Sequence, residues 1–309
     1  KLPFIAAAEV DHLLTWTGVT EALAAIHQKP RADLDDLLFR SGDDSVLTRA
    51  AWIRGYGIAV KIATIFPYNT TKFPNVPTVQ SLVTLFDDRS GEPLAILDGN
   101  LVTKWKTAGD SVLGAKLLAR KNSEVLTILG AGTVAESMID AYREIFPKLK
   151  TIYLWNHKFE KARRVAAKKN VLPIKHLEEA VKCADIISSA TTSEEPFIEG
   201  EWLKNGSHLD LIGAFRPDMR EAHDSVFTRG NIFVDSYKTA IHDIGELRIP
   251  LSKKVIFESD IINDFYGLCE GKSGRQTNSE ITIFKNGGGA HLDLAVAIHI
   301  KQIFGKENV

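Results

Sequence analysis

The sequence has few cysteines, no long hydrophobic run and almost no net charge, and each absence excludes a class of protein. Two cysteines, Cys183 and Cys269, lie far apart in the 309 residues without C-x-x-C spacing, so we expect neither a disulfide framework nor a thiolate metal site. No run approaches the roughly 18 apolar residues of a membrane span. Thirty-eight Lys and Arg against 39 Asp and Glu leave a net charge of −1, so we expect neither nucleic acid nor a membrane as partner.

Export signals and common metal or hydrolase motifs are also missing. The apolar start is interrupted by Glu9 and Asp11 and has no basic region before it, so we expect a reducing, cytoplasmic location. The sequence contains no H-E-x-x-H, no G-x-S-x-G and no Cys/His cluster, so no metal site and no serine-hydrolase chemistry are predicted. In contrast, 44% apolar residues support a substantial core, and the length fits about two domains.

The first third of the chain predicts a helix followed by an antiparallel sheet. Residues 17–27 space apolar side chains three or four apart, as an amphipathic helix does. The β-branched and aromatic runs that follow lack long helices between them, which favours antiparallel strands over 45–52, 57–66, 78–87 and 93–98. These strands offer more apolar surface than a small domain can bury, so we expect a homodimer through this sheet.

A helix expected over 101–120 leads into an alternating pattern of strands and helices. Its apolar strands are 125–129, 152–155, 185–190, 208–213 and 231–235. This alternation predicts a parallel sheet covered by helices, so the fold class is α/β with a Rossmann-type doubly wound sheet. The chain ends in a strand, a glycine-rich turn and a helix that we expect to pack on the first domain. The predicted domains are 1–118 with 286–309, and 119–285.

Residues 125–135 carry the most specific local motif, a buried strand followed by G-x-G-x-x-A and a helix. The first glycine permits the tight turn, the second lets the backbone approach a pyrophosphate, and small Ala135 allows close helix packing. The helix N-terminus then faces the anion. A turn that only serves packing is the alternative. We predict a dinucleotide-binding loop formed by Gly130, Ala131, Gly132, Thr133 and Val134.

The end of the next strand, Asn156-His157-Lys158, predicts which dinucleotide binds. NAD sites usually carry an acid there, which takes the ribose hydroxyls and repels a 2′-phosphate. Here the only acid nearby is Glu160, and a basic helix follows with Lys161, Arg163, Arg164, Lys168 and Lys169. The cations favour NADP(H), with NAD(H) possible, whereas an ordinary solvated helix face is the alternative.

Loops after two further strands are expected at the nicotinamide end of the dinucleotide. Ala190, Thr191 and Thr192 follow one strand and Gly213 follows another, where the carboxyl ends of the strands meet the cofactor. Their hydroxyl groups either hold the cofactor or cap the next segment.

Two lysines stand in unusual surroundings. Lys61 interrupts an apolar strand, and Lys106 lies in the first turns of the linking helix. Such a lysine is either a snorkelling edge residue or a buried cation with an anionic partner. His291 and Asp293 near the terminal glycines pose the same ambiguity, because i, i+2 spacing does not place two residues on one helix face.

With these motifs assembled, the chain resembles the ornithine cyclodeaminase/mu-crystallin family over nearly its whole length. The segments that carry the resemblance are, in order, GIAVKIATIFPYN, PTVQSLVTLFDDRSGEPLAILDGNLVTKWKTA, LGAGTVA, YLWNH and SATTSEEPFIEGEWLKNGSHLDLIGAFRPDMREAHD. The resemblance implies an NAD(P) domain in the middle of the chain. It also implies an α+β substrate-binding and dimerisation domain formed by the N-terminal part and the C-terminal helix.

The resemblance also implies roles for residues of this chain. Lys61 matches the family's substrate-carboxylate lysine and is the catalytic candidate, and Thr78 matches a threonine before the next strand. Lys106-Thr107 stands where the family has Arg-Thr, so the charge that grips the carboxylate is kept but the bidentate fork is lost, and Thr107 is expected at the cofactor. An upstream arginine that faces the carboxylate is best matched by Arg40, with Arg49 the other match.

The chain departs from the cyclodeaminases at Phe215, where those enzymes carry an aspartate that works on the substrate amine. A phenyl ring can neither act as a base nor pair with an ammonium group. We therefore predict NADPH-dependent reduction of a C=N bond next to a carboxylate, as in Δ1-pyrroline-2-carboxylate or Δ1-piperideine-2-carboxylate, to give proline or pipecolate. The alternatives are a cyclodeaminase that retains bound NAD, an alanine dehydrogenase-like enzyme and a non-catalytic ligand-binding member of the family.

Overall fold

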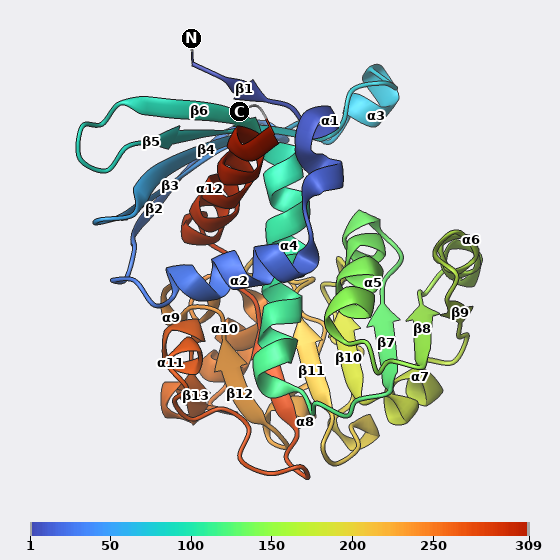
Figure 1. Ribbon diagram of the computed structural model, residues 1–309. Helices are drawn as coiled ribbons and strands as arrows, with labels where there is room; N and C mark the ends of the chain where they lie inside the picture. The colour runs from blue at the N-terminus through green and yellow to red at the C-terminus, as the bar shows by residue number, and fades with distance from the viewer. Residues whose placement is uncertain (1, 308–309) are drawn as a thin grey trace. The chain divides into compact units, whose positions relative to one another are not determined.

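The computed structural model describes residues 2–307, and the chain divides into two compact units (Figure 1). The first unit combines Lys1–Lys106 with Gly289–Val309, and the second is Thr107–Gly288. One boundary falls inside helix α4 (Gly99–Leu118), whereas the sequence placed it at the end of that helix. The other lies after Gly288 instead of after residue 285, so Asn286, Gly287 and Gly288 belong to the second unit and Gly289 to the first.

The first unit contains a six-stranded sheet in the order β1-β6-β5-β4-β3-β2. Its strands are β1 (Phe4–Ile5), β2 (Asp33–Ser41), β3 (Asp44–Ile53), β4 (Gly57–Ile65), β5 (Val79–Phe86) and β6 (Pro93–Asp98). Pairing from β2 to β6 is antiparallel, as predicted for β3 to β6, and β1 adds to β6 in parallel. The sequence did not predict β2, because its run of aspartates hides the strand pattern and its backbone bonds come from the hairpin with β3.

One face of this sheet is covered by the last helix. Helix α12 (Ala290–Glu307) packs against β3, β4 and β5 and against α2 (Trp16–Ile26), the helix predicted over 17–27 (Figure 1). Buried Val19, Leu23 and Ile26 of α2 give that contact its apolar face. The remaining helical segments of the unit are α1 (Ala7–Val10), η1 (Asp11–Leu13) and α3 (Asn69–Lys72).

The opposite face of the same sheet leaves apolar side chains exposed. Leu37, Ile62 and Leu82 lie in one register row across β2, β4 and β5, with Thr48 of β3 between the first two. Their exposed fractions are 54%, 48% and 48%. The face that carries Lys61 meets α12. Since successive side chains alternate between faces, Ile62 points away from it.

The second unit contains an eight-stranded parallel sheet in the order β13-β12-β14-β11-β10-β7-β8-β9. Its strands are β7 (Val125–Leu129), β8 (Thr151–Trp155), β9 (Leu172–Pro173), β10 (Ile186–Ser189), β11 (His208–Leu211), β12 (Asn231–Val234), β13 (Ile261–Asn263) and β14 (Thr282–Lys285). The five strands predicted from apolar runs are all present, and the missed β9 and β13 are two and three residues long. The strand order reverses between β7 and β10, which is the switch point where doubly wound sheets bind ligands.

Helices complete this unit. They are the C-terminal part of α4, α5 (Thr133–Ile145), α6 (Phe159–Lys169), α7 (Leu177–Cys183), η2 (Gly200–Trp202), α8 (Asp224–Phe227), α9 (Tyr237–Ala240), α10 (Gly245–Ser252), η3 (Glu258–Asp260) and α11 (Phe265–Cys269). Gly114 lets α4 pack closely on the sheet, because a Cβ there would lie 2.5 Å from the ring of Phe284. Between residues 2 and 307, no helix is both long and apolar enough to cross a bilayer.

Candidate active site

The glycine loop after β7 has the geometry that a pyrophosphate requires. Gly130 has a φ of 110°, and a Cβ there would lie 2.5 Å from the carbonyl oxygen of Ala190, so only glycine lets these two loops meet. Gly132 is the N-cap of α5 and has no side-chain cap. No atom of the described residues outside its immediate neighbours lies within 4 Å of a Cβ built on Gly132. This open backbone at a helix N-terminus fits a dinucleotide phosphate.

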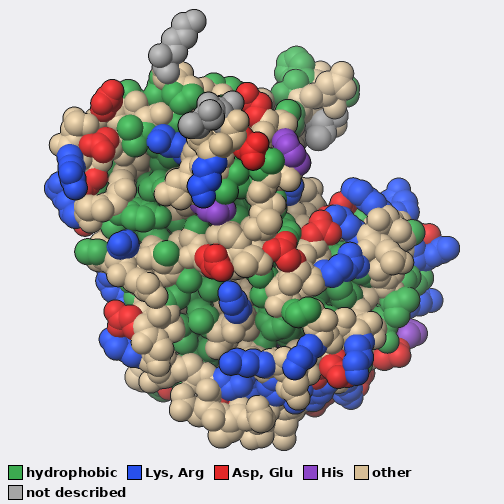
Figure 2. Space-filling model, in the orientation of Figure 1, with side chains coloured by type: hydrophobic (Ala, Val, Ile, Leu, Met, Phe, Trp, Pro, Cys, Tyr) green, Lys and Arg blue, Asp and Glu red, His purple; other side chains and the backbone are tan. Residues whose placement is uncertain are grey.

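Cations gather at the end of β8, where the adenosine ribose of a dinucleotide is expected. The side-chain amide of Asn156 donates to the carbonyl of Lys158 at 3.0 Å and so fixes the turn into α6. Arg163, Lys168 and Lys169 are held in ion pairs with acids of α5 and α6. In the described chain, no carboxylate forms an ion pair with Lys158, Lys161 or Arg164. Figure 2 shows the Lys and Arg side chains over α6, at the right of the view.

Buried Glu221 joins the two loops predicted at the nicotinamide end. Its Oε1 accepts hydrogen bonds from the hydroxyl of Ser189 at 2.6 Å and from both the backbone and the hydroxyl of Thr191, at 2.8 and 2.7 Å. Its Oε2 accepts from the backbone of Gly213 at 2.8 Å. The structure therefore brings Thr191 and Gly213 together, while Thr192 is exposed. Sequence analysis missed Glu221, because no spacing rule links an acid in the segment MREAHD to loops that precede it.

Further buried charges support the carboxyl ends of the central strands. The Lys285 ammonium group donates to the carbonyls of Leu211 and Ala214, each at 2.8 Å, although burial lowers the pKa of Lys285. Burial raises the pKa of Asp210 and of Glu246 to about 7 each. Sequence analysis did not single out these three residues. A lone lysine ending the buried strand ITIFK was the available signal.

The other predicted residues of this unit lie in different environments. Phe215 follows the loop after β11 and is 64% exposed, with the Arg216 guanidinium 5.8 Å from its ring centre. Thr133 and Val134 begin α5 and are exposed, whereas Ala131 is buried. Thr107 lies half-buried on α4.

In the first unit, Lys61 and Lys106 are buried cations that face one carboxylate. The Nζ of Lys61 lies 2.9 Å from Oδ1 of Asp293 and donates to the Thr103 hydroxyl at 2.5 Å. The Nζ of Lys106 lies 3.6 Å from Oδ2 of Asp293. Burial alone would raise the pKa of Asp293, but the charges of Lys106, Lys61 and Arg49 outweigh it and lower the pKa to about 2. Neither lysine is a snorkelling edge residue.

The arginine beside this cluster is Arg49. Arg49 lies directly opposite Lys61 in the β3–β4 register, and its guanidinium forms an ion pair of 2.7 Å with Asp36. Arg40, which the sequence favoured, is exposed near the other end of β2, opposite Ser45. Alignment by resemblance needs a gap in this region, and strand register is what distinguishes the two arginines. Thr78 lies just before β5, where its carbonyl accepts from the backbone of Phe66 at 2.8 Å.

His291, in the first turn of α12, lies close to the same charges. Its ring meets that of His27 edge to face, with 5.3 Å between the ring centres. Burial, followed by the positive charges of His27 and Lys106, lowers the pKa of His291 well below 6.5. The imidazole is therefore neutral at neutral pH. Neither of its ring nitrogens has a hydrogen-bond partner among residues 2–307.

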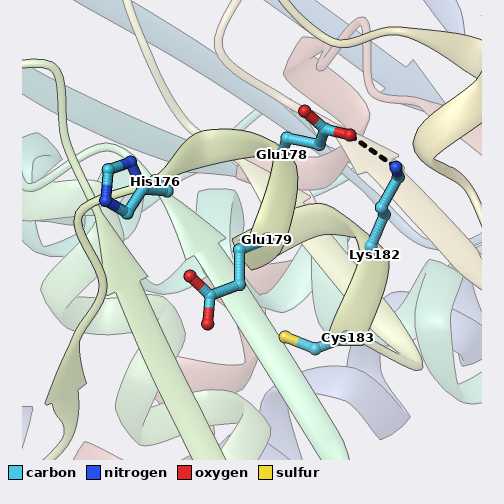
Figure 3. A pocket seen from close by; sticks show the side chains of 5 residues that line it. All are labelled: His176, Glu178, Glu179, Lys182 and Cys183. Carbon is cyan, nitrogen blue, oxygen red and sulfur yellow. Dashed lines mark hydrogen bonds and ion pairs between the residues drawn. The ribbon is translucent and has the colours of Figure 1, made fainter.

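Cavity volume does not identify this site. A surface pocket of about 610 Å³ is lined by His176, Glu178, Glu179, Lys182 and Cys183, where Glu178 and Lys182 form an ion pair (Figure 3). These residues belong to α7 and its N-cap, and α7 leads into the amino end of β10, whereas the glycine loop lies at the carboxyl ends of the strands. Within residues 2–307, no group of three or more His, Cys, Asp or Glu side chains is arranged to hold a metal ion.

Comparisons with known proteins assign the motifs to a family. Residues 49–307 match the model of the ornithine cyclodeaminase/mu-crystallin family. The chain is 40% identical over 306 residues to the Δ1-pyrroline-2-carboxylate reductase of Paracoccus denitrificans. This alignment covers 97% of this chain and 96% of that protein. It is 35% identical over 224 residues to the mouse ketimine reductase mu-crystallin, covering 72% and 69%.

A solved structure has the same fold over the whole chain. The Δ1-pyrroline-2-carboxylate reductase of Thermococcus litoralis, in complex with NADH and L-proline, superposes with a TM-score of 0.90. The two chains are 25% identical, and the superposition covers 100% of this chain and 99% of that one. The α/β fold with a Rossmann-type sheet, predicted from the alternation of strands and helices, is thereby confirmed.

Proposed function

Because this chain belongs to the ornithine cyclodeaminase/mu-crystallin family, we propose that it is an NAD(P)H-dependent reductase of C=N bonds next to a carboxylate. Its substrate is Δ1-pyrroline-2-carboxylate, which yields proline, with the piperideine homologue yielding pipecolate. The names of the Paracoccus and mouse relatives support this reaction class. The observation that carries the proposal is the pair of buried lysines, Lys61 and Lys106, that converge on one carboxylate.

The charges of the first unit suit a substrate carboxylate. Lys61, Lys106 and Arg49 are three cations that face two carboxylates, Asp293 and Asp36. This group of positive charges would attract an anionic ligand. Because the two lysines are buried, a carboxylate bound there is poorly screened by water, and the attraction is stronger than at the surface. Lys61 and Lys106 are the residues that hold it.

The second unit provides the residues for a dinucleotide, which when bound supplies a hydride from its nicotinamide ring. Gly132 and the N-terminus of α5 hold the pyrophosphate, and Thr191 lies at the nicotinamide end. Lys158, with Lys161 and Arg164, holds a 2′-phosphate, so NADPH is preferred over NADH. The lack of an acid in the sequence Asn156-His157-Lys158 supports that preference.

The chemical step needs little acid catalysis. The imine carbon gains the hydride, and the π electrons of the C=N bond become a lone pair on nitrogen. When the imine enters protonated, the nitrogen keeps its proton and the product is a neutral secondary amine. When it enters neutral, the Lys61 ammonium group is the catalytic acid that supplies this proton. Holding both ligands in line supplies the rest of the rate enhancement.

Phe215 argues against the lyase alternative, because its side chain has no ionisable group to act on an amine. The test is to follow absorbance at 340 nm with NADPH and Δ1-pyrroline-2-carboxylate, and in parallel to measure ammonia released from ornithine without added reductant. We expect NADPH oxidation that depends on the imine, and no ammonia. Ammonia release without imine reduction would make the protein a cyclodeaminase.

The exposed apolar row of the first sheet supports a homodimer as part of the proposal. Leu37, Ile62 and Leu82 are exposed apolar side chains on strands whose other face is already covered by α12. Pairing this face with a second copy removes it from water. Both cysteines are free thiols, which fits a reducing, cytoplasmic location.

A further inference from the structure

We infer that Glu221 is a positioning residue that orients the Thr191 hydroxyl, so that its oxygen accepts a hydrogen bond from the carboxamide of a bound nicotinamide. The inference rests on the proposed function, because it requires a nicotinamide dinucleotide at residues 130–134. It adds a residue that touches neither ligand and acts on the nicotinamide through Thr191.

Four hydrogen-bond donors meet the Glu221 carboxylate. Two hydroxyls, those of Ser189 and Thr191, and two backbone amides, those of Thr191 and Gly213, donate to its two oxygens. A carboxylate, which only accepts, satisfies all four. Glu221 is itself fixed, because its own amide and that of Ala222 donate to the Glu246 carboxylate at 2.8 and 2.9 Å. Its position is therefore set before any ligand binds.

This arrangement leaves the Thr191 oxygen as an acceptor. Its proton is used in the 2.7 Å bond to Glu221. A hydroxyl oxygen has two lone pairs, and the amide of Ser193, at 3.3 Å, takes one of them. The remaining lone pair suits a donor such as the carboxamide NH₂ group. Without Glu221, the hydroxyl would be free to rotate and to present its proton to that same NH₂ group.

Thr191 also lies next to the dinucleotide loop. A Cβ built on Gly130 would lie 2.5 Å from the carbonyl oxygen of Ala190 and 3.5 Å from the Cγ2 atom of Thr191. The glycine turn and the Thr191 loop are thus in direct contact at the switch point between β7 and β10.

The experiment compares two ligands that differ only in the nicotinamide. Isothermal titration measures the affinity of the full-length protein for NADPH and for 2′-phospho-ADP-ribose, which lacks the ring and its carboxamide. Glu221→Gln replaces one carboxylate oxygen by an NH₂ group, which faces a donor instead of accepting its hydrogen bond. We expect it to weaken NADPH about ten-fold while changing the affinity for 2′-phospho-ADP-ribose less than about two-fold. Thr191→Val should do the same, and Thr191→Ser should keep the wild-type affinity for NADPH.

A double variant and a matched control complete the test. If Glu221 acts through Thr191, Glu221→Gln combined with Thr191→Val should bind NADPH no more weakly than either single variant. Ser189→Ala, in β10, removes another donor to the same Glu221 oxygen. It should leave the ratio of the affinities for NADPH and 2′-phospho-ADP-ribose unchanged.

Three results would overturn the inference. The first is an equal loss of affinity for both ligands in Glu221→Gln. The second is an additive loss of NADPH affinity in the double variant, and the third is full NADPH affinity in Thr191→Val. The last result requires no change at Glu221, so it decides the question even if Glu221→Gln does not fold. Failure of the proposed function would look different, because the wild-type protein would then bind no dinucleotide or reduce no imine.

Discussion

Lys61 on β4 and Asp293 on α12 are 232 positions apart in the sequence, yet the Lys61 Nζ lies 2.9 Å from Asp293 Oδ1 in the interior of the first unit. This ion pair ties the last helix to the sheet and fixes the ammonium group. Removing two charges from water is expensive, and an apolar pair of similar size would serve stability as well or better. The pair therefore fits a binding role better than a purely structural one.

Replacing Lys61 by methionine tests that role. We expect Lys61→Met to lower kcat/KM for Δ1-pyrroline-2-carboxylate about a hundredfold or more, because losing one partner of a desolvated ion pair costs roughly 2–5 kcal/mol. Lys106→Met should have an effect of the same order. The affinity for NADPH should change little in Lys61→Met, since Lys61 belongs to the first unit and the glycine loop to the second.

A second substitution separates binding from stability. Lys61→Met leaves Asp293 buried with one close partner fewer, which should lower the unfolding free energy by about 3–5 kcal/mol in urea denaturation. Lys61→Met combined with Asp293→Leu should regain most of that stability but none of the activity. Full activity in Lys61→Met would show that the Lys61–Asp293 pair has only a structural role. Recovery of activity together with stability in the Lys61→Met, Asp293→Leu variant would show the same.

The cofactor preference depends on Lys158. We expect the wild-type protein to use NADPH with a higher kcat/KM than NADH, because no acid at the end of β8 repels a 2′-phosphate. Lys158→Ala should raise the KM for NADPH about ten-fold and leave the KM for NADH nearly unchanged. Lys182→Ala, which removes an exposed lysine from α7, is the matched control and should alter neither. Equal or better use of NADH by the wild type would refute the 2′-phosphate site.

The oligomeric state tests the role of the exposed row on the first sheet. Light scattering at micromolar concentration should give the mass of a dimer for the wild type and of a monomer for Ile62→Glu, because the charge would have to be buried at the interface. Leu172→Glu is the control: Leu172 is 53% exposed on β9 of the second unit, and its substitution should leave the dimer intact. A monomeric wild type would contradict the proposed dimer.

Stability should depend on pH through His208. Burial, followed by the charge of Arg275, lowers the pKa of His208 from 6.5 to about 3. Below pH 6.5 the unfolded chain takes up a proton that the folded protein cannot, so this group lowers the unfolding free energy as the pH falls. Between pH 6.5 and 5 the loss is about 1.5–2 kcal/mol, because the slope approaches roughly 1.36 kcal/mol per pH unit only well below pH 6.5.

The variant His208→Gln isolates that contribution. Asp210 and Glu246, with pKa values raised to about 7, act in the opposite direction, since the folded protein holds their protons more tightly than the unfolded chain. Only the difference between wild type and His208→Gln is therefore informative. The stability of the variant should fall less between pH 6.5 and 5, whereas exposed His176→Gln should behave as the wild type. Parallel pH curves for wild type and His208→Gln would show that His208 is protonated in the folded state.

Local sequence patterns predicted most of the fold. Apolar runs such as 125–129 are buried on both faces and mark parallel strands, and the G-x-G turn is fixed by backbone sterics at Gly130. Strand β2 was missed, because its strand state depends on pairing with β3 and not on its own acidic residues. The boundary between the two units inside α4 could not be predicted either. A continuous helix carries no local signal that its two halves pack into different units.

The candidate site was only partly predictable, for the same physical reason. Lys61 stood out as a lysine in an apolar strand, but its partner Asp293 is set by how α12 packs on β4. Arg49 was ranked below Arg40, because register, which places Arg49 opposite Lys61, is a property of paired strands. Glu221 was missed because its four donors come from the end of β10 and from two loops, which meet only in the folded sheet.

The most direct test of the proposed reaction is to trace the hydride itself. The protein would be incubated with Δ1-pyrroline-2-carboxylate and NADPH that carries deuterium on the transferring face of C4, and the product analysed by mass spectrometry and NMR. We expect proline with a single deuterium at its α-carbon, formed in step with loss of absorbance at 340 nm. Proline without deuterium, or no proline from the imine while ornithine releases ammonia, would contradict the proposed reaction.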